Sequence, residues 1–162
     1  MKSPTTLVLG IGNVLRKDDG AGIRVIELLQ ERGLPESVRL LDGGTAGLDL
    51  LPYLEGADRI IVVDALLSGD PAGTITVRSG DEMREHDVFM SGHFGRLTEL
   101  LDLAAELWTR SEAIIIGITP KDCESYETAL SPEVDEAAVR AADRIAEMVS
   151  QGTSLDASQK SS

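Results

Sequence analysis

Residues 7–13 read LVLGIGN and residues 18–22 read DDGAG, and these two short segments decide the fold. The apolar run is typical of a buried β-strand, and it stops at glycines, which let the backbone turn sharply or approach a neighbour closely. Two adjacent carboxylates, Asp18 and Asp19, then precede an amphipathic helix, whose positive N-terminal end favours negative charge and polar ligands. This order predicts a strand, a loop of the kind that forms binding sites, and a helix.

Apolar runs alternate with segments of helical periodicity along the chain, which is typical of an α/β domain with a mainly parallel sheet. The runs at 60–63 and 114–116 are apolar without alternation, so we expect two central strands covered on both faces. The run at 74–77 alternates and follows Asp64 after a connection too short for a crossover helix, which predicts an antiparallel edge strand. The five predicted strands are 6–11, 38–41, 59–63, 74–77 and 113–118.

Three helices are predicted from apolar residues that recur at helical spacing. The first follows the two aspartates, the second spans 92–108 and places Trp108 in the core, and the third begins after Ser131 with a proline in its first turn. We therefore predict a three-layer α/β sandwich, with a mostly parallel, twisted sheet of about five strands, one antiparallel edge strand, and helices on both faces. Residues 1–150 form a single domain in this interpretation, and residues 151–162, which have almost nothing to bury, form a mobile tail.

The composition excludes several classes of protein. A chain of 162 residues, 42% hydrophobic and 27% charged, is long enough for one folded domain, and its net charge of −13 argues against nucleic acid or an anionic membrane as partner. Cys123 is the only cysteine, and nearby acidic residues would raise the pKa of its thiol, so neither a disulfide nor a cysteine nucleophile is expected. The first apolar run is too short for a signal peptide or a membrane span. We expect a monomeric cytoplasmic protein.

Acidic residues follow three of the predicted strands. Asp18 and Asp19 follow the first strand, Asp42 the second and Asp64 the third. Since the carboxyl ends of parallel strands meet at one edge of a sheet, where open α/β sheets bind ligands, these side chains are expected to share a site. Each aspartate taken singly is more often a helix cap or a turn former, but their joint placement favours a site. His93 adds an imidazole, and two carboxylates with one histidine suit a divalent ion such as Ni, Zn, Mn or Fe.

The segments that carry these residues resemble, in the same order, those of the nickel-iron hydrogenase maturation proteases. The matching segments are Gly-x-Gly-Asn and Asp-Asp-Gly-x-Gly at 10–22, Asp-Gly-Gly-Thr at 42–45, Val-Asp-Ala at 63–65, the histidine at 93, and Gly-Ile-Thr-Pro at 117–120. The resemblance covers about residues 7–149. The sequence departs from the family pattern at Asp19, where some members carry Glu, and at Ala129, where a glycine is common.

The resemblance implies an endopeptidase that removes the C-terminal extension of the hydrogenase large-subunit precursor. It implies that Asp19, Asp64 and His93 bind the metal, with Asp19 and Asp64 also as candidate catalytic residues. It implies as well that the segment at 42–45 recognises the substrate, through the residues Asp42, Gly43, Gly44 and Thr45. Nickel would be carried by the precursor, so that cleavage follows metal insertion. Peptide hydrolysis needs an activated water, which either the ion or one of the two carboxylates could supply.

Two other interpretations remain open. A dinucleotide-binding domain would use the glycines of residues 10–12 as its phosphate turn, but Leu15 occupies the third glycine position of Gly-x-Gly-x-x-Gly. Asp42 also lies about thirty residues beyond that turn, whereas the ribose-binding acid is expected near twenty. A non-catalytic metal-binding or chaperone module could use the same acids and histidine without cleaving a peptide.

Overall fold

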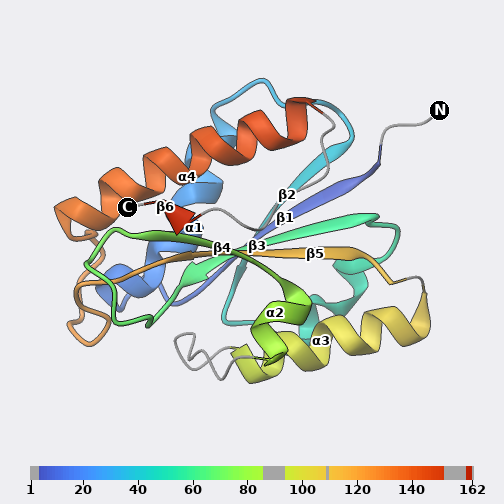
Figure 1. Cartoon of the computed structure of the whole chain (residues 1–162), viewed down its shortest axis with the longest axis horizontal. Helices are drawn as coiled ribbons and strands as arrows, with labels where there is room; N and C mark the ends of the chain where they lie inside the picture. Colours follow the sequence, from blue (N-terminus) through green and yellow to red (C-terminus); the bar gives the residue numbers. More distant parts are fainter. Residues whose placement is uncertain (1–3, 86–93, 109, 152–159, 162) are drawn as a thin grey trace.

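The computed structural model describes residues 4–85, 94–108, 110–151 and 160–161, which form one mixed sheet with helices on both faces (Figure 1). The strand order is β2-β1-β3-β5-β4-β6. The strands are β1 (Thr6–Ile11), β2 (Val38–Gly44), β3 (Arg59–Ala65), β4 (Ile75–Ser79), β5 (Glu112–Ile118) and β6 (Lys160–Ser161). The α-helices are α1 (Ala21–Gln30), α2 (Gly80–Glu85), α3 (Phe94–Leu107) and α4 (Pro132–Gln151), and two 3₁₀ helices, η1 (Lys17–Gly20) and η2 (Gly47–Leu54), follow β1 and β2.

The pairing of the strands confirms the predicted fold class. β1 pairs in parallel with β2 and with β3, and β3 pairs in parallel with β5. β4 runs antiparallel to β5, and beyond it the two residues of β6 pair with Ile75 and Thr76. β3 and β5 lie in the middle of the sheet, as their uninterrupted apolar runs predicted, and every residue of β3 after Arg59 is buried.

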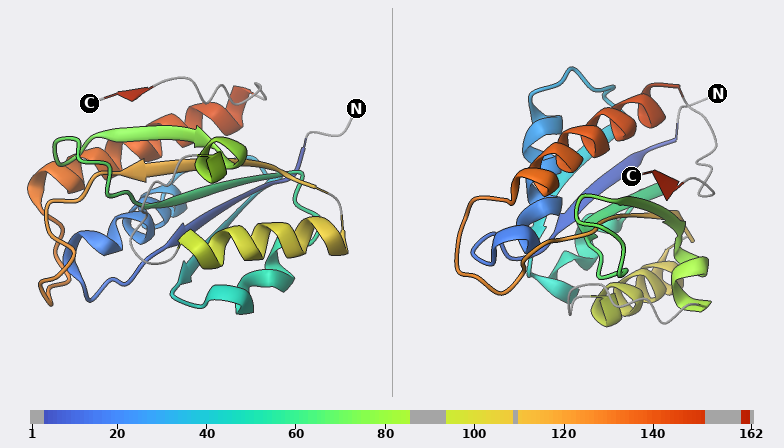
Figure 2. Two further views of the ribbon diagram at one scale, coloured as in Figure 1. Left: turned by 60° about the horizontal axis from the view of Figure 1, so that its bottom comes forward. Right: turned by 60° about the vertical axis from the view of Figure 1, so that its left-hand side comes forward.

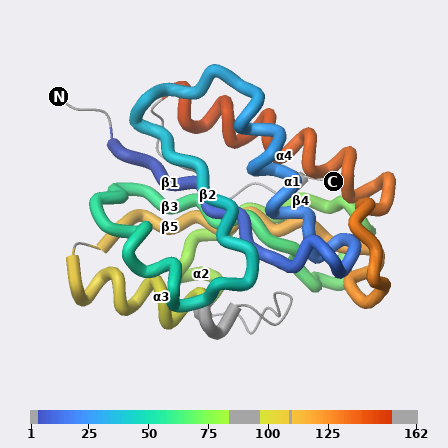
Figure 3. Tube along the Cα trace, turned by 180° about the vertical axis from the view of Figure 1, so that it is seen from behind, coloured from blue at the N-terminus to red at the C-terminus, as the bar shows by residue number. Residues whose placement is uncertain are grey.

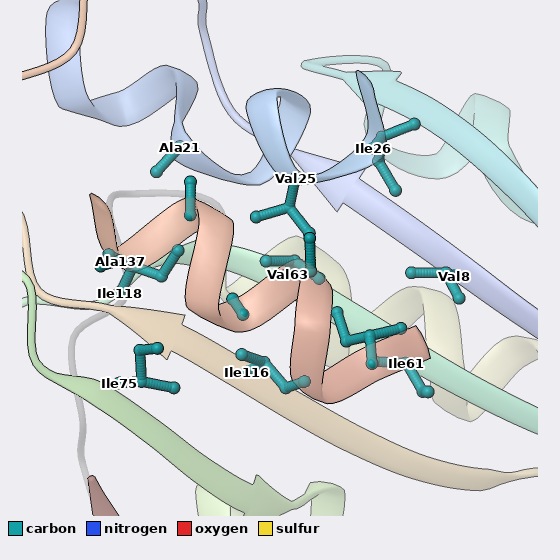
Figure 4. Close-up of a cluster of buried hydrophobic side chains, with 14 of the residues drawn as sticks. Val8, Ala21, Val25, Ile26, Ile61, Val63, Ile75, Ile116, Ile118 and Ala137 are labelled. Atoms are coloured by element: carbon teal, nitrogen blue, oxygen red, sulfur yellow. The ribbon is translucent and has the colours of Figure 1, made fainter. Parts of the chain in front are cut away.

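Alternation of side chains along the strands divides the core into two halves, as expected for a sheet that is covered on both sides. On one side, Val8, Ile61 and Ile116 point toward α1 and α4 (Figure 4). On the other side, Leu7 and Leu9 belong to a second cluster with residues of η2 and α3. Figure 2 shows the resulting layers, with α1 and α4 over one side of the sheet and α3 with η2 over the other. The three-layer arrangement brings the ends of β1, β3 and β5 together at one edge.

Helix α1 packs directly on the backbone of the sheet. A Cβ atom on Gly22 would lie 2.2 Å from the carbonyl oxygen of Val63 and 2.8 Å from that of Ile11. Real side chains do not approach carbonyl oxygens so closely, so the close contact of this helix with β1 and β3 requires a glycine. The same contact fixes the start of α1, and with it η1, above the end of β3.

Several elements differ from those predicted. β2 and β3 extend to Gly44 and Ala65, so the aspartates expected just beyond these strands lie within them. α2 and η2 were not predicted. The position of Trp108 was predicted wrongly, because α3 ends at Leu107 and the indole ring is 36% exposed, while the last buried residue of this helix is Ala104. Within the described ranges, none of the helices has the length and apolar character needed to cross a membrane.

Candidate active site

The two adjacent aspartates of η1 have different surroundings. Asp18 is completely buried, and its carboxylate accepts hydrogen bonds from the backbone N–H groups of Lys121 (2.9 Å), Asp122 (2.9 Å) and Ser131 (2.7 Å) and from the Ser131 hydroxyl (2.8 Å). The Asp18 N–H in turn donates to the Asp122 carbonyl at 2.9 Å. Asp18 therefore connects η1 to the long loop between β5 and α4. Both oxygens of its carboxylate accept hydrogen bonds from that loop, so the side chain has a structural role.

Asp19 is turned toward the loop that follows β1. Its Oδ2 accepts a hydrogen bond from the Asn13 N–H at 2.8 Å, and the residue is 4% exposed. The Asn13 side chain accepts a hydrogen bond from the Leu15 N–H at 3.0 Å, which folds the β1–η1 loop back on itself. The short apolar strand and the glycines after it thus produce a tight loop whose own backbone orients the carboxylate.

Asp64 reaches the same region from the middle of the sheet. It is the penultimate residue of β3 and is fully buried, and its Oδ1 accepts a hydrogen bond from the Ala65 N–H at 2.8 Å. A buried carboxylate at the carboxyl end of a central strand is costly to desolvate and is a frequent mark of a functional site in open α/β sheets.

Gly12 lies between these two aspartates. Its φ of 134° is one that side-chain-bearing residues rarely adopt, and a Cβ there would lie 1.9 Å from the Asp19 carbonyl oxygen and 3.6 Å from Oδ1 of Asp64. The absence of a side chain at this position is what lets η1 approach the end of β3. Gly12 therefore packs against the backbone of Asp19 and beside the carboxylate of Asp64, and the shared site of the two aspartates stays a prediction.

Cys123, which was predicted to have no site role, lies within electrostatic range of these aspartates. Burial, and after it the negative charges of Asp19, Asp18 and Asp64 in that order, raise the pKa of its thiol to about 12. The direction agrees with the prediction that Cys123 is not a nucleophile. The residue follows β5, a central strand whose carboxyl end lies at the same edge, and this rule could have placed Cys123 near the aspartates from the sequence.

The glycine-rich segment at the end of β2 lies next to the loop of Gly12. The Gly12 N–H donates to the Gly44 carbonyl at 2.9 Å, and the Gly44 N–H donates to Oδ1 of Asp42 at 3.1 Å. Gly43 is buried, whereas Asp42 and Thr45 are exposed. The segment therefore borders the candidate site with two polar side chains that are open to a partner.

The predicted third ligand, His93, lies outside the described residues. In the portion of the chain that the structure describes, no group of three or more His, Cys, Asp or Glu side chains could hold a metal ion. Asp19 and Asp64 are both buried at the carboxyl edge of the sheet, and their role as metal ligands with His93 stays a prediction. A cavity of about 440 Å³, lined among others by Ile60, Ser79 and Arg110, lies at the start of β3 and β5, at the opposite edge from the aspartates.

Fold and site together define a three-layer α/β protein with buried carboxylates at the carboxyl ends of its central strands. A family model described as hydrogenase maturation protease matches residues 23–148. The chain is 41% identical over 142 residues to the hydrogenase expression/formation protein HupD of Rhodobacter capsulatus, covering 82% of this chain and 65% of that protein. It is 33% identical over 135 residues to the hydrogenase 2 maturation protease of Escherichia coli K12, covering 80% of each chain.

Solved structures show the same relationship. The hydrogenase maturating endopeptidase HybD from E. coli superimposes with a TM-score of 0.80 at 30% sequence identity, over 91% of this chain and 93% of that one. The chain belongs to the hydrogenase maturation protease family. It spans about two thirds of the length of the R. capsulatus relative.

Proposed function

We propose that this protein is an endopeptidase that removes the C-terminal extension of a nickel-iron hydrogenase large-subunit precursor after nickel insertion, acting as a monomer in the cytoplasm. The observation that carries the proposal is that Gly12 packs against the backbone of Asp19 and beside the carboxylate of Asp64. Two buried aspartates from separate elements thus lie at the sheet edge where α/β proteins bind their ligands. Family membership supplies the substrate class, because the relatives are described as hydrogenase maturation proteases.

In this proposal nickel belongs to the substrate, and the protease recognises it with Asp19, Asp64 and His93. Carboxylate oxygens and an imidazole nitrogen are suitable donors for a borderline divalent ion such as nickel. Gly12 leaves the Asp64 carboxylate uncovered on one side, because a Cβ atom at residue 12 would stand 3.6 Å from its Oδ1. A precursor without its ion would lack this attachment, so cleavage would depend on metal insertion.

The chemistry proposed for the chain itself is general-base catalysis. Peptide hydrolysis requires a water molecule that loses a proton as it attacks the carbonyl carbon, and a positioned carboxylate can accept that proton. Asp19 and Asp64 are the two candidates, and the hydrogen bond from the Asn13 N–H holds Asp19 in one orientation. The exposed polar groups of Asp42 and Thr45, on the segment of residues 42–45, would contact the precursor chain beside them.

The test is cleavage of a nickel-loaded large-subunit precursor, followed by mass spectrometry of the released C-terminal peptide. We expect the wild-type protein to release the peptide only when the precursor contains nickel. Asp19→Asn, Asp64→Asn and His93→Ala should each abolish release while thermal unfolding shows that the fold is kept. Asp49→Asn makes the same chemical change at an exposed position of η2 and should leave cleavage unchanged.

Two outcomes would contradict the proposal. Full cleavage by folded Asp19→Asn or Asp64→Asn protein would remove these carboxylates from the mechanism. Tight binding of the nickel-loaded precursor without release of any peptide would favour the non-catalytic module instead.

A further inference from the structure

An open hollow beside η1 exposes apolar side chains. It has a volume of about 540 Å³ and is lined by Leu15 from the β1–η1 loop and by Tyr126, Glu127, Thr128 and Ala129 from the β5–α4 loop. Leu15 is 58% exposed and Tyr126 is 84% exposed, in a chain of which only 3% is aromatic. We call these five residues the Leu15/Tyr126 surface. Large apolar side chains held open to solvent in a hollow are typical of a site that binds another chain.

The two loops that form the Leu15/Tyr126 surface are fixed to each other. They run side by side at one end of the molecule (Figure 3), where the Lys17 N–H donates to the Glu127 carbonyl at 2.8 Å. The Lys17 ammonium group also pairs with the Glu127 carboxylate at 2.7 Å, and the Arg16 guanidinium lies 6.0 Å from the centre of the Tyr126 ring. Because these contacts order the surface in advance, a binding partner would lose less conformational entropy on association.

The Leu15/Tyr126 surface is continuous with the candidate active site. The Leu15 N–H donates to the Asn13 side chain, and the Asn13 N–H donates to the Asp19 carboxylate. On the other loop, Tyr126 follows Cys123 by three residues, and the Cys123 thiol senses the charges of Asp19 and Asp64. The Leu15/Tyr126 surface and Asp19 are therefore linked through the β1–η1 loop.

Charge on these loops favours a basic partner. Among the exposed side chains of the two segments, Glu124 and Glu127 are acidic and Arg16 and Lys121 are basic, since Asp18 and Asp19 are buried. The basic side chains already contact Glu127, Glu133 or the ring of Tyr126. By contrast, no ion pair of the exposed Glu124 is found among the described residues. With a net charge of −13 over the whole chain, a basic segment would be attracted here and an acidic one repelled.

We propose that the Leu15/Tyr126 surface binds an extended segment of the substrate precursor that carries a large apolar side chain next to a basic residue. The apolar side chain fills the hollow between Leu15 and Tyr126, and the basic one faces Glu124. The proposal rests on the proposed function, since it assigns the partner as the precursor, and it adds the chemistry by which the precursor chain is selected.

The first test compares two leucines of equal exposure. Leu15→Ala removes an apolar contact of the surface, and Leu107→Ala makes the same change at the end of α3, where the side chain is 56% exposed. Loss of a buried leucine contact should raise the KM for the nickel-loaded precursor about tenfold, with kcat unchanged. Leu107→Ala should keep the wild-type KM. Equal KM values for the two variants would overturn the proposal.

The second test uses acetylated hexapeptides in which a central leucine is flanked either by lysines or by glutamates. The lysine peptide should inhibit precursor cleavage by the wild-type protein and lose its effect on Leu15→Ala, and the glutamate peptide should not inhibit. Glu124→Gln should weaken inhibition by the lysine peptide and should also raise the KM for the precursor, with kcat unchanged. Equal inhibition by the two peptides, or unchanged inhibition of both variants, would overturn the proposal.

The proposal that the Leu15/Tyr126 surface binds the precursor can be wrong independently of the proposed function, and the experiments distinguish the two cases. If the wild-type protein cleaves no precursor, the proposed function is wrong, and NMR shift changes on adding the lysine peptide still report whether the Leu15/Tyr126 surface binds it. Shifts confined to this surface would support the peptide-binding site. Sedimentation that shows a wild-type dimer and a monomeric Leu15→Ala protein would instead assign the surface to a second copy of the chain.

Discussion

Replacing Asp18 by asparagine should destabilise the protein much more than its single-atom change suggests. The wild-type carboxylate accepts four hydrogen bonds in a fully buried position, from the N–H groups of Lys121, Asp122 and Ser131 and from the Ser131 hydroxyl. An asparagine keeps one acceptor oxygen and puts an NH₂ group at the other position. One donor would then face another donor.

The magnitude follows from these contacts. A buried donor left without an acceptor costs about 1–3 kcal/mol, and the remaining bonds lose the extra strength that the negative charge gave them. We expect Asp18→Asn to lower the free energy of unfolding by about 3 kcal/mol, which is about 10 °C in Tm for a domain of this size. Asp18→Ala leaves all four donors without the carboxylate and should cost about 4 kcal/mol or more.

The assay is urea unfolding followed by circular dichroism, with Asp42→Asn as the control. Asp42 is exposed and accepts one hydrogen bond from the Gly44 N–H, so its variant should lie within about 0.5 kcal/mol of the wild type. A stability of Asp18→Asn equal to that of Asp42→Asn would show that the β5–α4 loop does not depend on this carboxylate. The reasoning about η1 would then be refuted.

Two further predictions concern the packing of Gly22 and the reactivity of the Cys123 thiol. Gly22→Ala should destabilise the protein by about 2 kcal/mol in thermal or urea unfolding, because the new Cβ would lie 2.2 Å from the Val63 carbonyl oxygen. The control is Gly33→Ala, where a Cβ would have nothing within 4 Å, and this variant should be neutral or slightly stabilising. Equal effects of the two would argue against the close packing of α1 on the sheet. Because burial and nearby carboxylates raise the thiol pKa of Cys123 from an ordinary 9.0 to about 12, iodoacetamide at pH 8, with EDTA present, should react about a thousandfold more slowly than with free cysteine. Asp19→Asn should accelerate that reaction by lowering the pKa, and rapid labelling of the wild-type thiol would contradict the placement of Cys123 beside the aspartates.

The layers of the fold could be predicted because they depend on local patterns. The uninterrupted apolar residues of β3 and β5 mark strands covered on both faces, and the alternation in β4 marks a strand beside them, whatever the rest of the chain does. The ends of helices are harder to predict from the sequence than the strands. The apolar spacing of α3 continues to Trp108, yet the last turn of this helix extends beyond the residues on which it packs, so both Leu107 and Trp108 are exposed.

The candidate site was predictable at the level of strand ends and not at the level of single carboxylates. That Asp19 and Asp64 share an edge follows from parallel pairing. The structural role of Asp18 could not be predicted, because its hydrogen-bond donors belong to residues 121–131, more than a hundred positions further along the chain. No local sequence pattern indicates such contacts.

The bonds of Asp18 also set the order in which the site can form during synthesis. The carboxylate is made early in translation, but the hydroxyl and N–H groups that hold it appear only once the ribosome has added Ser131, 113 residues later. Until then η1 lacks the loop that the Asp18 carboxylate binds in the folded protein. Through most of synthesis the Asp18 carboxylate therefore lacks the partners that offset the cost of its burial in the folded protein.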